Sequence, residues 1–249
     1  MSKIAVAGAT GRLGPHVVDV LEAQGHDVVR IARSTGVDVI TGTGLAEALE
    51  GVEVVIDATT PPTPDEQAAI EFFRTAARNL QEEGQRAGVR RIVVVSIVGI
   101  DRISGGYNAG KVVQEQTHLV GPIPVRILRA TQFHEFVEQL MDWGRQDDVC
   151  HLWRMRTQLV AARTVGEAAC ELATDEHPVP APGEAPIWEI AGPREESLVE
   201  AARRLAACNG DPVRVEGIDP PDPLFESGGS LPGPDATLAG PTFDEWMRR

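Results

Sequence analysis

The sequence predicts an α/β protein with a doubly wound parallel sheet and smaller C-terminal elements. Apolar runs typical of strands alternate with amphipathic helical segments through roughly the first 148 residues. The run Val52–Ala58 is almost continuously apolar, as expected for a strand that is covered on both faces. From residue 149 the alternation loosens. We therefore expect one unit over residues 1–249, with a core at about 1–148 and a cap at about 149–249.

The chain begins with a strand, a glycine-rich turn and a helix. The apolar run Ile4–Ala7 is followed by Gly8, Gly11 and Gly14 and then by an amphipathic segment. Backbone N–H groups at such a helix start, together with the helix dipole, favour an anion such as a dinucleotide pyrophosphate. Gly8 permits a tight turn, Gly11 a close approach to phosphate and Gly14 close helix–strand packing. The GxxGxxG spacing differs from the commoner GxGxxG, and a purely structural turn is the alternative.

The second predicted strand, Asp27–Ala32, ends at an arginine instead of a carboxylate. A carboxylate at this place binds the ribose 2′-hydroxyl of NAD, whereas an arginine accommodates the 2′-phosphate of NADP. Arg33 is therefore the expected 2′-phosphate contact, and Ser34 can add a hydrogen bond. We predict that NADP(H) is preferred over NAD(H); a solvated loop arginine is the alternative.

A polar loop follows the strand Val52–Ala58. Because ligands of open α/β sheets lie at the carboxyl ends of the strands, Thr59 and Thr60 are candidate cofactor contacts. Between the second strand and this one, Val37–Ile40 is predicted to form a short third strand, and residues 45–49 a helix.

A second group of candidate residues follows the fifth predicted strand, Arg91–Val95, which ends at Ser96. A helix over Tyr107–Val120 places Tyr107 and Lys111 one turn apart on the same face. An ammonium beside a phenol is expected to lower the pKa of the phenol and suit it for proton transfer to a carbonyl oxygen. An aromatic ring packed on an aliphatic lysine stem is the alternative.

Further candidates follow the sixth predicted strand, Pro124–Ala130. Thr131 is an expected cofactor contact, and Phe133, His134 and Phe136 are expected substrate contacts. Core packing of the two phenylalanines and a surface or capping role of the histidine are the alternatives. The other predicted elements are a helix over Asp65–Arg86, a strand over Gln158–Ala161, a helix over Val165–Thr174, a proline-rich loop over 177–186, a strand over Ile187–Ala191, a helix over Leu198–Ala207, a strand over Val213–Ile218 and a long loop over Asp219–Pro241.

The segments GATGRLG, SIVGI, YNAGK and LRATQFHEF, taken in series, resemble the short-chain dehydrogenase/reductase superfamily in its atypical NmrA-like branch. The resemblance implies a Rossmann-type fold and a catalytic set of Ser96, Tyr107 and Lys111, with Lys111 also holding the nicotinamide ribose. It implies a pyrophosphate loop of Gly8, Thr10, Gly11, Arg12, Leu13 and Gly14. The acidic residue that this family usually has after its third strand is missing from residues 41–44. The branch includes reductases and non-catalytic redox sensors.

Composition limits the partners. The formal charge of −14 and the pI of about 4.8 disfavour nucleic acid and anionic membranes. Cys150, Cys170 and Cys208 are too few and too scattered for a disulfide framework or a metal site, so no metal is expected. Without a secretion signal or an apolar run of membrane length, a cytoplasmic protein is expected.

The expected function is NADPH-dependent hydride transfer to or from a carbonyl or alcohol of a small organic substrate. The alternatives are a non-catalytic NADP(H) sensor and an NAD(P)-dependent epimerase or dehydratase. A homodimer through the long helix and the helix of Tyr107 is possible in this superfamily.

Overall fold

The computed structural model describes residues 2–175 and 187–248, and the chain divides into two compact units. The first unit comprises Met1–Ser96, Ser104–Arg129 and Val165–Trp188, and the second comprises Ile97–Ile103, Ala130–Thr164 and Glu189–Arg249. This division differs from a single boundary near residue 148, because the chain leaves and re-enters each unit. The loop expected over residues 177–186 lies outside the described residues.

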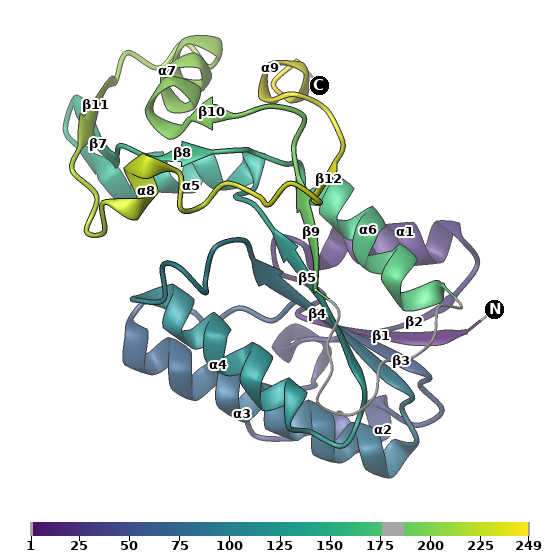
Figure 1. Ribbon diagram of the computed structural model, residues 1–249. Coiled ribbons are helices and arrows are strands. Elements are labelled where there is room, and N and C mark those ends of the chain that lie inside the picture. Colours follow the sequence, from purple (N-terminus) through teal and green to yellow (C-terminus); the bar gives the residue numbers. More distant parts are fainter. Residues whose placement is uncertain (1, 176–186, 249) are drawn as a thin grey trace. The chain divides into compact units, whose positions relative to one another are not determined.

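A parallel sheet forms the centre of the fold (Figure 1). In the described part of the chain it has seven strands in the order β12-β9-β5-β4-β3-β1-β2. The strands are β1 (Lys3–Ala7), β2 (Asp27–Ile31), β3 (Val54–Asp57), β4 (Arg91–Ile97), β5 (Val125–Ala130), β9 (Ile187–Ala191) and β12 (Thr237–Leu238). All four residues of β3 are buried, as its apolar sequence predicts. The predicted Rossmann-type α/β fold is confirmed.

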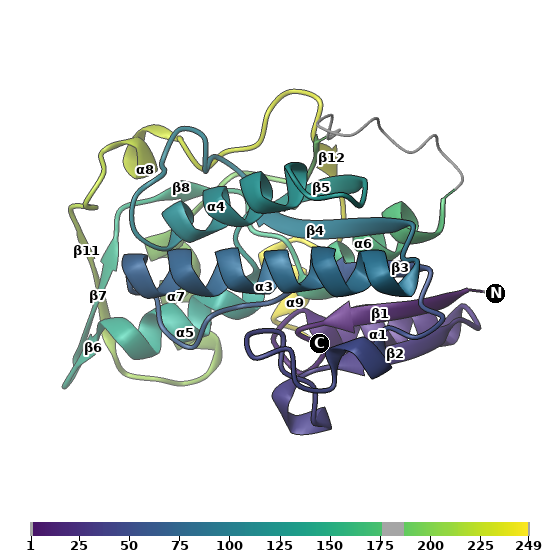
Figure 2. The same cartoon turned by 90° about the horizontal axis from the view of Figure 1, so that it is seen from below.

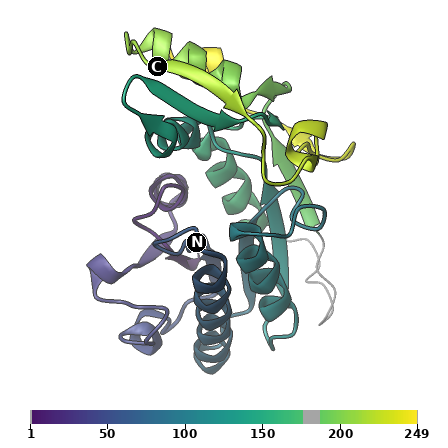
Figure 3. The same cartoon turned by 90° about the vertical axis from the view of Figure 1, so that its left-hand side faces the viewer.

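Helices cover the sheet of the first unit. They are α1 (Gly14–Ala23), α2 (Leu45–Ala48), α3 (Glu66–Ala87), α4 (Tyr107–Leu119) and α6 (Ala162–Thr174), of which the first three residues belong to the second unit. Helices α3 and α4 lie side by side (Figures 2 and 3). They approach closely because Gly110 has no side chain: a Cβ there would lie 2.9 Å from Ala69. Helix α6 contacts α1, where Cys170 Sγ lies 3.6 Å from the Val17 carbonyl oxygen.

The expected third strand over Val37–Ile40 is wrong. A 3₁₀ turn, η1 (Arg33–Thr35), follows β2, and the chain then turns instead of pairing with a strand. The Asn79 side-chain amide of α3 donates to the carbonyl oxygens of Val39 (2.8 Å) and Ile40 (3.0 Å). A helix side chain therefore satisfies the carbonyl groups that a sheet neighbour would otherwise bind.

The second unit has a core of its own, in which α5 and α7 pack on a small sheet of order β11-β7-β6. Its elements are α5 (His134–Gly144), β6 (Arg145–Gln146), β7 (Val149–Trp153), β8 (Arg156–Thr157), β10 (Glu196–Ser197), α7 (Leu198–Cys208), β11 (Arg214–Ile218), α8 (Leu224–Ser227) and α9 (Phe243–Trp246). The expected strand over Gln158–Ala161 is reduced to one bridge between Val160 and Phe133. The expected loop over Asp219–Pro241 contains α8 and β12.

Among the described helices, none combines the length and the apolar character that crossing a membrane requires.

Candidate functional site

The turn after β1 contains three glycines. A side chain on Gly8 or Gly14 would clash with backbone atoms, whereas a Cβ on Gly11 has more room. Gly8 has a φ of +80°, and a Cβ on it would lie 2.5 Å from the Ala58 carbonyl oxygen. A Cβ on Gly14 would lie 2.2 Å from the Gly8 carbonyl oxygen. Gly11 is exposed, and its Cβ would meet only the Gly8 carbonyl oxygen, at 3.2 Å. Because Gly11 has no side chain and is exposed, another molecule can approach the backbone closely at this position.

The N-terminus of α1 is suited to an anion. In the described part of the chain, no side chain caps the N-terminus of this ten-residue helix, and Pro15 occupies its first turn. Leu13 is buried beneath the turn, whereas Thr10 and Arg12 are exposed. The positive end of the helix dipole is thus not already neutralised by a cap, and the turn fits a dinucleotide pyrophosphate.

Arg33 and Ser34 lie next to this turn. They follow β2, and the Gly8 backbone N–H donates to the Ile31 carbonyl oxygen at 3.0 Å, so the ends of β1 and β2 are adjacent. Both side chains are exposed. In the described part of the chain, the Arg33 guanidinium has no ion-pair partner. It can therefore bind a phosphate without first breaking another contact.

The two threonines after β3 differ in their contacts. Thr59 is buried, and its N–H (3.0 Å) and its hydroxyl (2.7 Å) both donate to Asp57 Oδ1. Thr60 is exposed, and its side chain is near enough to that of Tyr107 to oppose the rise of the Tyr107 pKa. Thr59 thus has a structural role, and Thr60 connects this loop to the first residue of α4.

Tyr107 and Lys111 both pack against Phe73 of α3. The rings of Tyr107 and Phe73 are 5.7 Å apart, and Lys111 Nζ lies 4.5 Å from the centre of the Phe73 ring. Lys111 Nζ donates to the Val95 carbonyl oxygen at 2.9 Å. Since Val95 precedes Ser96, the structure brings the ammonium to the end of β4 beside the serine.

The expected lowering of the Tyr107 pKa is wrong in this structure. Burial raises it to about 12, the hydrogen bond with Thr60 opposes this, and the charge of Asp57 adds to it. Lys111 does not lower it because its ammonium is turned toward Val95 and Gln114. Burial lowers the pKa of Lys111 itself to about 8, against the attraction of Asp57 and Glu115. Near neutral pH, Tyr107 is therefore a protonated phenol and Lys111 an ammonium.

Ser96 carries a buried hydroxyl that has no hydrogen-bond partner among the described residues. An unpaired buried polar group of this kind costs about 1–3 kcal/mol. A ligand oxygen that accepts or donates a hydrogen bond at Ser96 would remove this cost.

Sequence reasoning missed the polar inward face of α4. Its buried residues are Gly110, Lys111, Gln114, Glu115 and His118. Asp57, at the end of β3, accepts hydrogen bonds on Oδ2 from Gln114 Nε2 (2.7 Å) and His118 Nε2 (3.0 Å). Burial alone raises the pKa of Asp57, but the hydrogen bonds from His118 and Thr59 and the charges of His118 and Lys111 hold it below its usual range. The spacing of these residues in α4 (i, i+3, i+4, i+7) was the available signal.

Four predicted residues belong to the second unit. Thr131 is buried, and its hydroxyl donates to the Gln158 carbonyl oxygen at 2.5 Å. Phe133 is half-buried and precedes α5, and Phe136 packs edge-on against Trp143 at 5.8 Å. These contacts account for the packing of Thr131 and Phe136.

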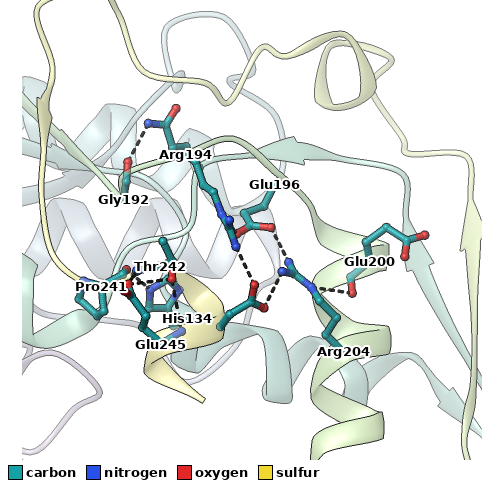
Figure 4. Close-up of polar contacts among 11 residues, drawn as sticks. His134, Gly192, Arg194, Glu196, Glu200, Arg204, Pro241, Thr242 and Glu245 are labelled. Atoms are coloured by element: carbon teal, nitrogen blue, oxygen red, sulfur yellow. Dashed lines mark hydrogen bonds and ion pairs between the residues drawn. The ribbon is translucent and has the colours of Figure 1, made fainter. Parts of the chain in front are cut away.

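His134 is fully buried at the start of α5. Its Nε2 lies 3.1 Å from the Pro241 carbonyl oxygen (Figure 4), to which a protonated Nε2 donates. Its ring lies 5.3 Å from that of Phe243 and 5.5 Å from that of Trp246. His134 is therefore not a surface residue, and its contacts hold the segment around α9.

One family model matches the part of the chain that contains the glycine turn, helix α1, Tyr107 and Lys111. The sequence model of the family described as NAD(P)H-binding matches residues 8–118. The matched range runs from Gly8, the first glycine of the turn, to His118, which contacts Asp57. The predicted NAD(P)H-binding character is confirmed for this range.

One curated protein is similar in sequence over part of its length. Photosystem II assembly factor Ycf39 from Synechocystis sp. (strain ATCC 27184 / PCC 6803 / Kazusa) is 31% identical over 110 residues, which cover 39% of this chain and 34% of that protein. The chain thus matches about a third of the length of this relative.

Two solved structures show the same fold. The UDP-N-acetylglucosamine 4-epimerase from Bacillus cereus is 16% identical with a TM-score of 0.70, covering 98% of this chain and 93% of the epimerase. An NADPH-dependent quinone oxidoreductase (QOR2) from Escherichia coli is 18% identical with a TM-score of 0.65, covering 98% of each chain. This fold therefore carries both oxidoreductases and epimerases.

Proposed function

We propose that this protein is an NADPH-dependent oxidoreductase that acts on a carbonyl or alcohol group of a small organic substrate. The observation that carries the proposal is at the end of β4. There the Lys111 ammonium contacts the residue before Ser96, and the buried Ser96 hydroxyl has no partner among the residues that the structure describes. Tyr107 begins the same helix as Lys111. These are the groups that orient a carbonyl oxygen and donate a proton to it.

The residues around the glycine turn fit the cofactor. Gly11 leaves space for a pyrophosphate at the uncapped start of α1, and the exposed Arg33 is available for a 2′-phosphate. When bound, NADP(H) supplies or accepts the hydride. The Lys111 ammonium has three hydrogens, of which two bind Val95 and Gln114, so one is left for a ribose hydroxyl.

Tyr107 supplies the proton in this proposal. Its pKa of about 12 keeps the hydroxyl protonated near neutral pH, so the resting state is that of an acid. The hydroxyl must leave the neighbourhood of the Thr60 side chain and form a hydrogen bond with the substrate oxygen. Ser96 donates to the same oxygen, which gives its buried hydroxyl a partner.

Titration of the purified protein with NADPH and with NADH is the first test. We expect tighter binding of NADPH, and Arg33→Ala should weaken NADPH at least about tenfold while leaving NADH nearly unchanged, since only NADPH carries the 2′-phosphate. Equal weakening of both would remove Arg33 as the group that distinguishes them. Absence of binding by the wild type would contradict the whole proposal.

The glycine turn offers a matched pair of variants. Gly11→Ala places its Cβ 3.2 Å from one carbonyl oxygen, so the fold should persist while NADPH affinity falls. Gly14→Ala places its Cβ 2.2 Å from the Gly8 carbonyl oxygen, so it should destabilise the fold itself. Unchanged NADPH affinity in a folded Gly11→Ala protein would show that the cofactor does not approach there.

A non-catalytic NADP(H) sensor is the second candidate. It is favoured by the contacts of Tyr107 with Thr60 and of Lys111 with Gln114, which leave the two side chains unconnected. Tyr107→Phe separates the two functions in a screen of carbonyl substrates. Loss of turnover by about 10²-fold or more with retained NADPH binding supports the oxidoreductase. NADPH binding without turnover of any substrate by the wild type supports the sensor, and tightly retained oxidised cofactor would indicate an epimerase or dehydratase.

A further inference from the structure

The Asp57 carboxylate lies at the centre of the buried polar cluster in the first unit. Oδ1 accepts from the Thr59 N–H and hydroxyl, and Oδ2 accepts from Gln114 (2.7 Å) and His118 (3.0 Å). Gln114 Oε1 in turn accepts from Lys111 Nζ at 2.8 Å. Two hydrogen bonds through one amide therefore join the carboxylate to the ammonium.

Tyr107 is joined to the same carboxylate from the other side. Its hydroxyl is next to the Thr60 side chain, and the preceding residue, Thr59, is held by Asp57 through two hydrogen bonds. Asp57 ends a fully buried strand, so it is a rigid point of attachment. Tyr107 and Lys111, one turn apart on α4, are thus both tied to one atom group on β3.

Only a carboxylate satisfies the four donors that converge here. An asparagine has one acceptor oxygen, so at least one of the donors from Thr59, Gln114 and His118 would face an N–H group. The orientation of the Gln114 amide is also fixed, because its oxygen faces an ammonium and its nitrogen faces a carboxylate. Reversing it would place an N–H against Lys111.

We propose that Asp57, acting through Gln114 and through the Thr59–Thr60 segment, is the positioning residue for both Lys111 and Tyr107. This inference rests on the proposed function, which gives the two side chains their chemical roles. Asp57 touches neither of them directly, so its effect is to fix where the ammonium and the hydroxyl lie.

The charges around Lys111 come from several elements. Asp57 faces it from β3, and Glu115 is on its own helix, where it forms a bidentate pair with Arg129 of β5 (3.0 and 2.9 Å). Phe73 of α3 and the Val95 carbonyl oxygen of β4 complete the surroundings. His118 contacts the same Asp57 oxygen, Oδ2, as Gln114 does. Asp57 is thus the anion near Lys111 that no arginine is paired with in the described hydrogen bonds and ion pairs.

The composition allows a direct test. The chain has two lysines, Lys3 and Lys111, and one tyrosine, Tyr107. Selective ¹³C labelling of lysine and tyrosine therefore gives two lysine Cε signals and one tyrosine Cζ signal. Titrating both with pH in the protein without cofactor reports on Lys111 and Tyr107 individually, with Lys3 as an internal reference.

In Asp57→Asn, we expect the titration midpoint of Lys111 to fall from about 8, its acid dissociation constant rising about tenfold or more, because a neighbouring anion is lost. The Tyr107 midpoint should fall as well, since the same anion raises it. Local unfolding gives the opposite result for the lysine, whose midpoint would then rise toward 10.5. The direction for Lys111 therefore separates positioning from general damage.

A second variant covers the case in which Asp57→Asn does not fold. Gln114→Met keeps the volume and the Asp57 charge but removes the link, so the Lys111 midpoint should fall while that of Tyr107 stays. Asn79→Ala removes two partly buried hydrogen bonds elsewhere in the same unit and should move neither midpoint. A Lys111 midpoint that stays or rises in folded Asp57→Asn or Gln114→Met overturns the positioning role. Failure of the wild type to bind NADPH, measured separately, overturns the proposed function instead.

Discussion

Two polar clusters in this protein each contain an aspartate carboxylate, but in different surroundings. The cluster of Asp57, Gln114 and His118 in the first unit is fully buried. In the second unit, Arg194 and Arg204 (Figure 4) each bind Asp244 at 2.7 Å and also bind Glu196. One half of the Arg194 side chain is exposed. In the first cluster a neutral amide, that of Gln114, links Asp57 to the Lys111 ammonium, whereas in the second cluster carboxylates and guanidinium groups pair directly.

The difference follows from the cost of desolvation. A charge on the surface keeps part of its hydration, so forming or breaking an ion pair there changes the free energy of unfolding only slightly. A buried charge loses its hydration, and removing one of its partners leaves an uncompensated group. The exposed cluster therefore serves to attach α9, whose Thr242 and Glu245 form a capping box (Figure 4). The buried cluster carries a desolvation cost, as is expected of residues that serve the proposed catalytic function.

The largest expected change in the free energy of unfolding comes from a substitution in the buried cluster. Asp57→Asn should lower the free energy of unfolding by about 3 kcal/mol, because it leaves buried donors unpaired. Urea denaturation at neutral pH measures it, with Asp244→Asn as the matched change in the exposed cluster. Equal losses in the two variants would break the comparison.

A smaller effect is expected in alkali. The Lys111 pKa is about 8 when folded and near 10.5 when solvated, so between these values the unfolded chain holds a proton that the folded protein has released. The contribution of Lys111 to the free energy of unfolding therefore rises with pH, on the order of 2 kcal/mol between about pH 8 and pH 10. The contribution of Tyr107 to the free energy of unfolding falls with pH between pH 10 and about pH 12, because the folded protein keeps a proton that the unfolded chain has released.

Urea denaturation over this pH range tests the alkaline effect. Lys111→Met should remove the rise with pH, whereas Lys3→Met, which changes an exposed contact to the Glu50 carbonyl oxygen, should keep it. A rise that persists in Lys111→Met would show that another group causes it.

The smallest expected effect is in the exposed cluster. Asp244→Asn should cost about 1 kcal/mol or less, and the cost should shrink at high salt because exposed charges are screened. The hydrogen bond and charge of Arg194 and the charge of Arg204 overcome the opposing effect of burial and lower the pKa of Asp244. This contribution is therefore present at neutral pH and is lost as the carboxyl protonates in acid. Salt-independent destabilisation would mean that Asp244 acts through packing of α9.

Local patterns predicted much of the fold. The glycine turn, the helix ending near Arg86 and the helix beginning at Tyr107 lie where the sequence indicates, because caps and periodicity act over a few residues. The Val37–Ile40 strand failed because β-branched residues indicate a strand only if a neighbour is present to bind them, and Asn79 takes that place.

The site was harder to predict than the fold. Polar residues at inward positions of a helix are taken for a solvated face until a buried carboxylate is known to face them. That Asp57 meets Gln114 and His118 depends on the packing of α4 against β3, which spacing along the chain does not specify. The Tyr107–Lys111 spacing gave a shared helix face, but not the direction in which the longer lysine side chain points.

The division of the chain has a consequence for its synthesis. The chain crosses between the two units five times, after Ser96, Ile103, Arg129, Thr164 and Trp188. Strand β5 is completed at Ala130, but its neighbour β9 begins only at Ile187. Until then a nascent chain has an open, hydrophobic strand edge, which favours slow folding and association with other chains. A fragment ending near residue 148 keeps that edge permanently and should aggregate when expressed.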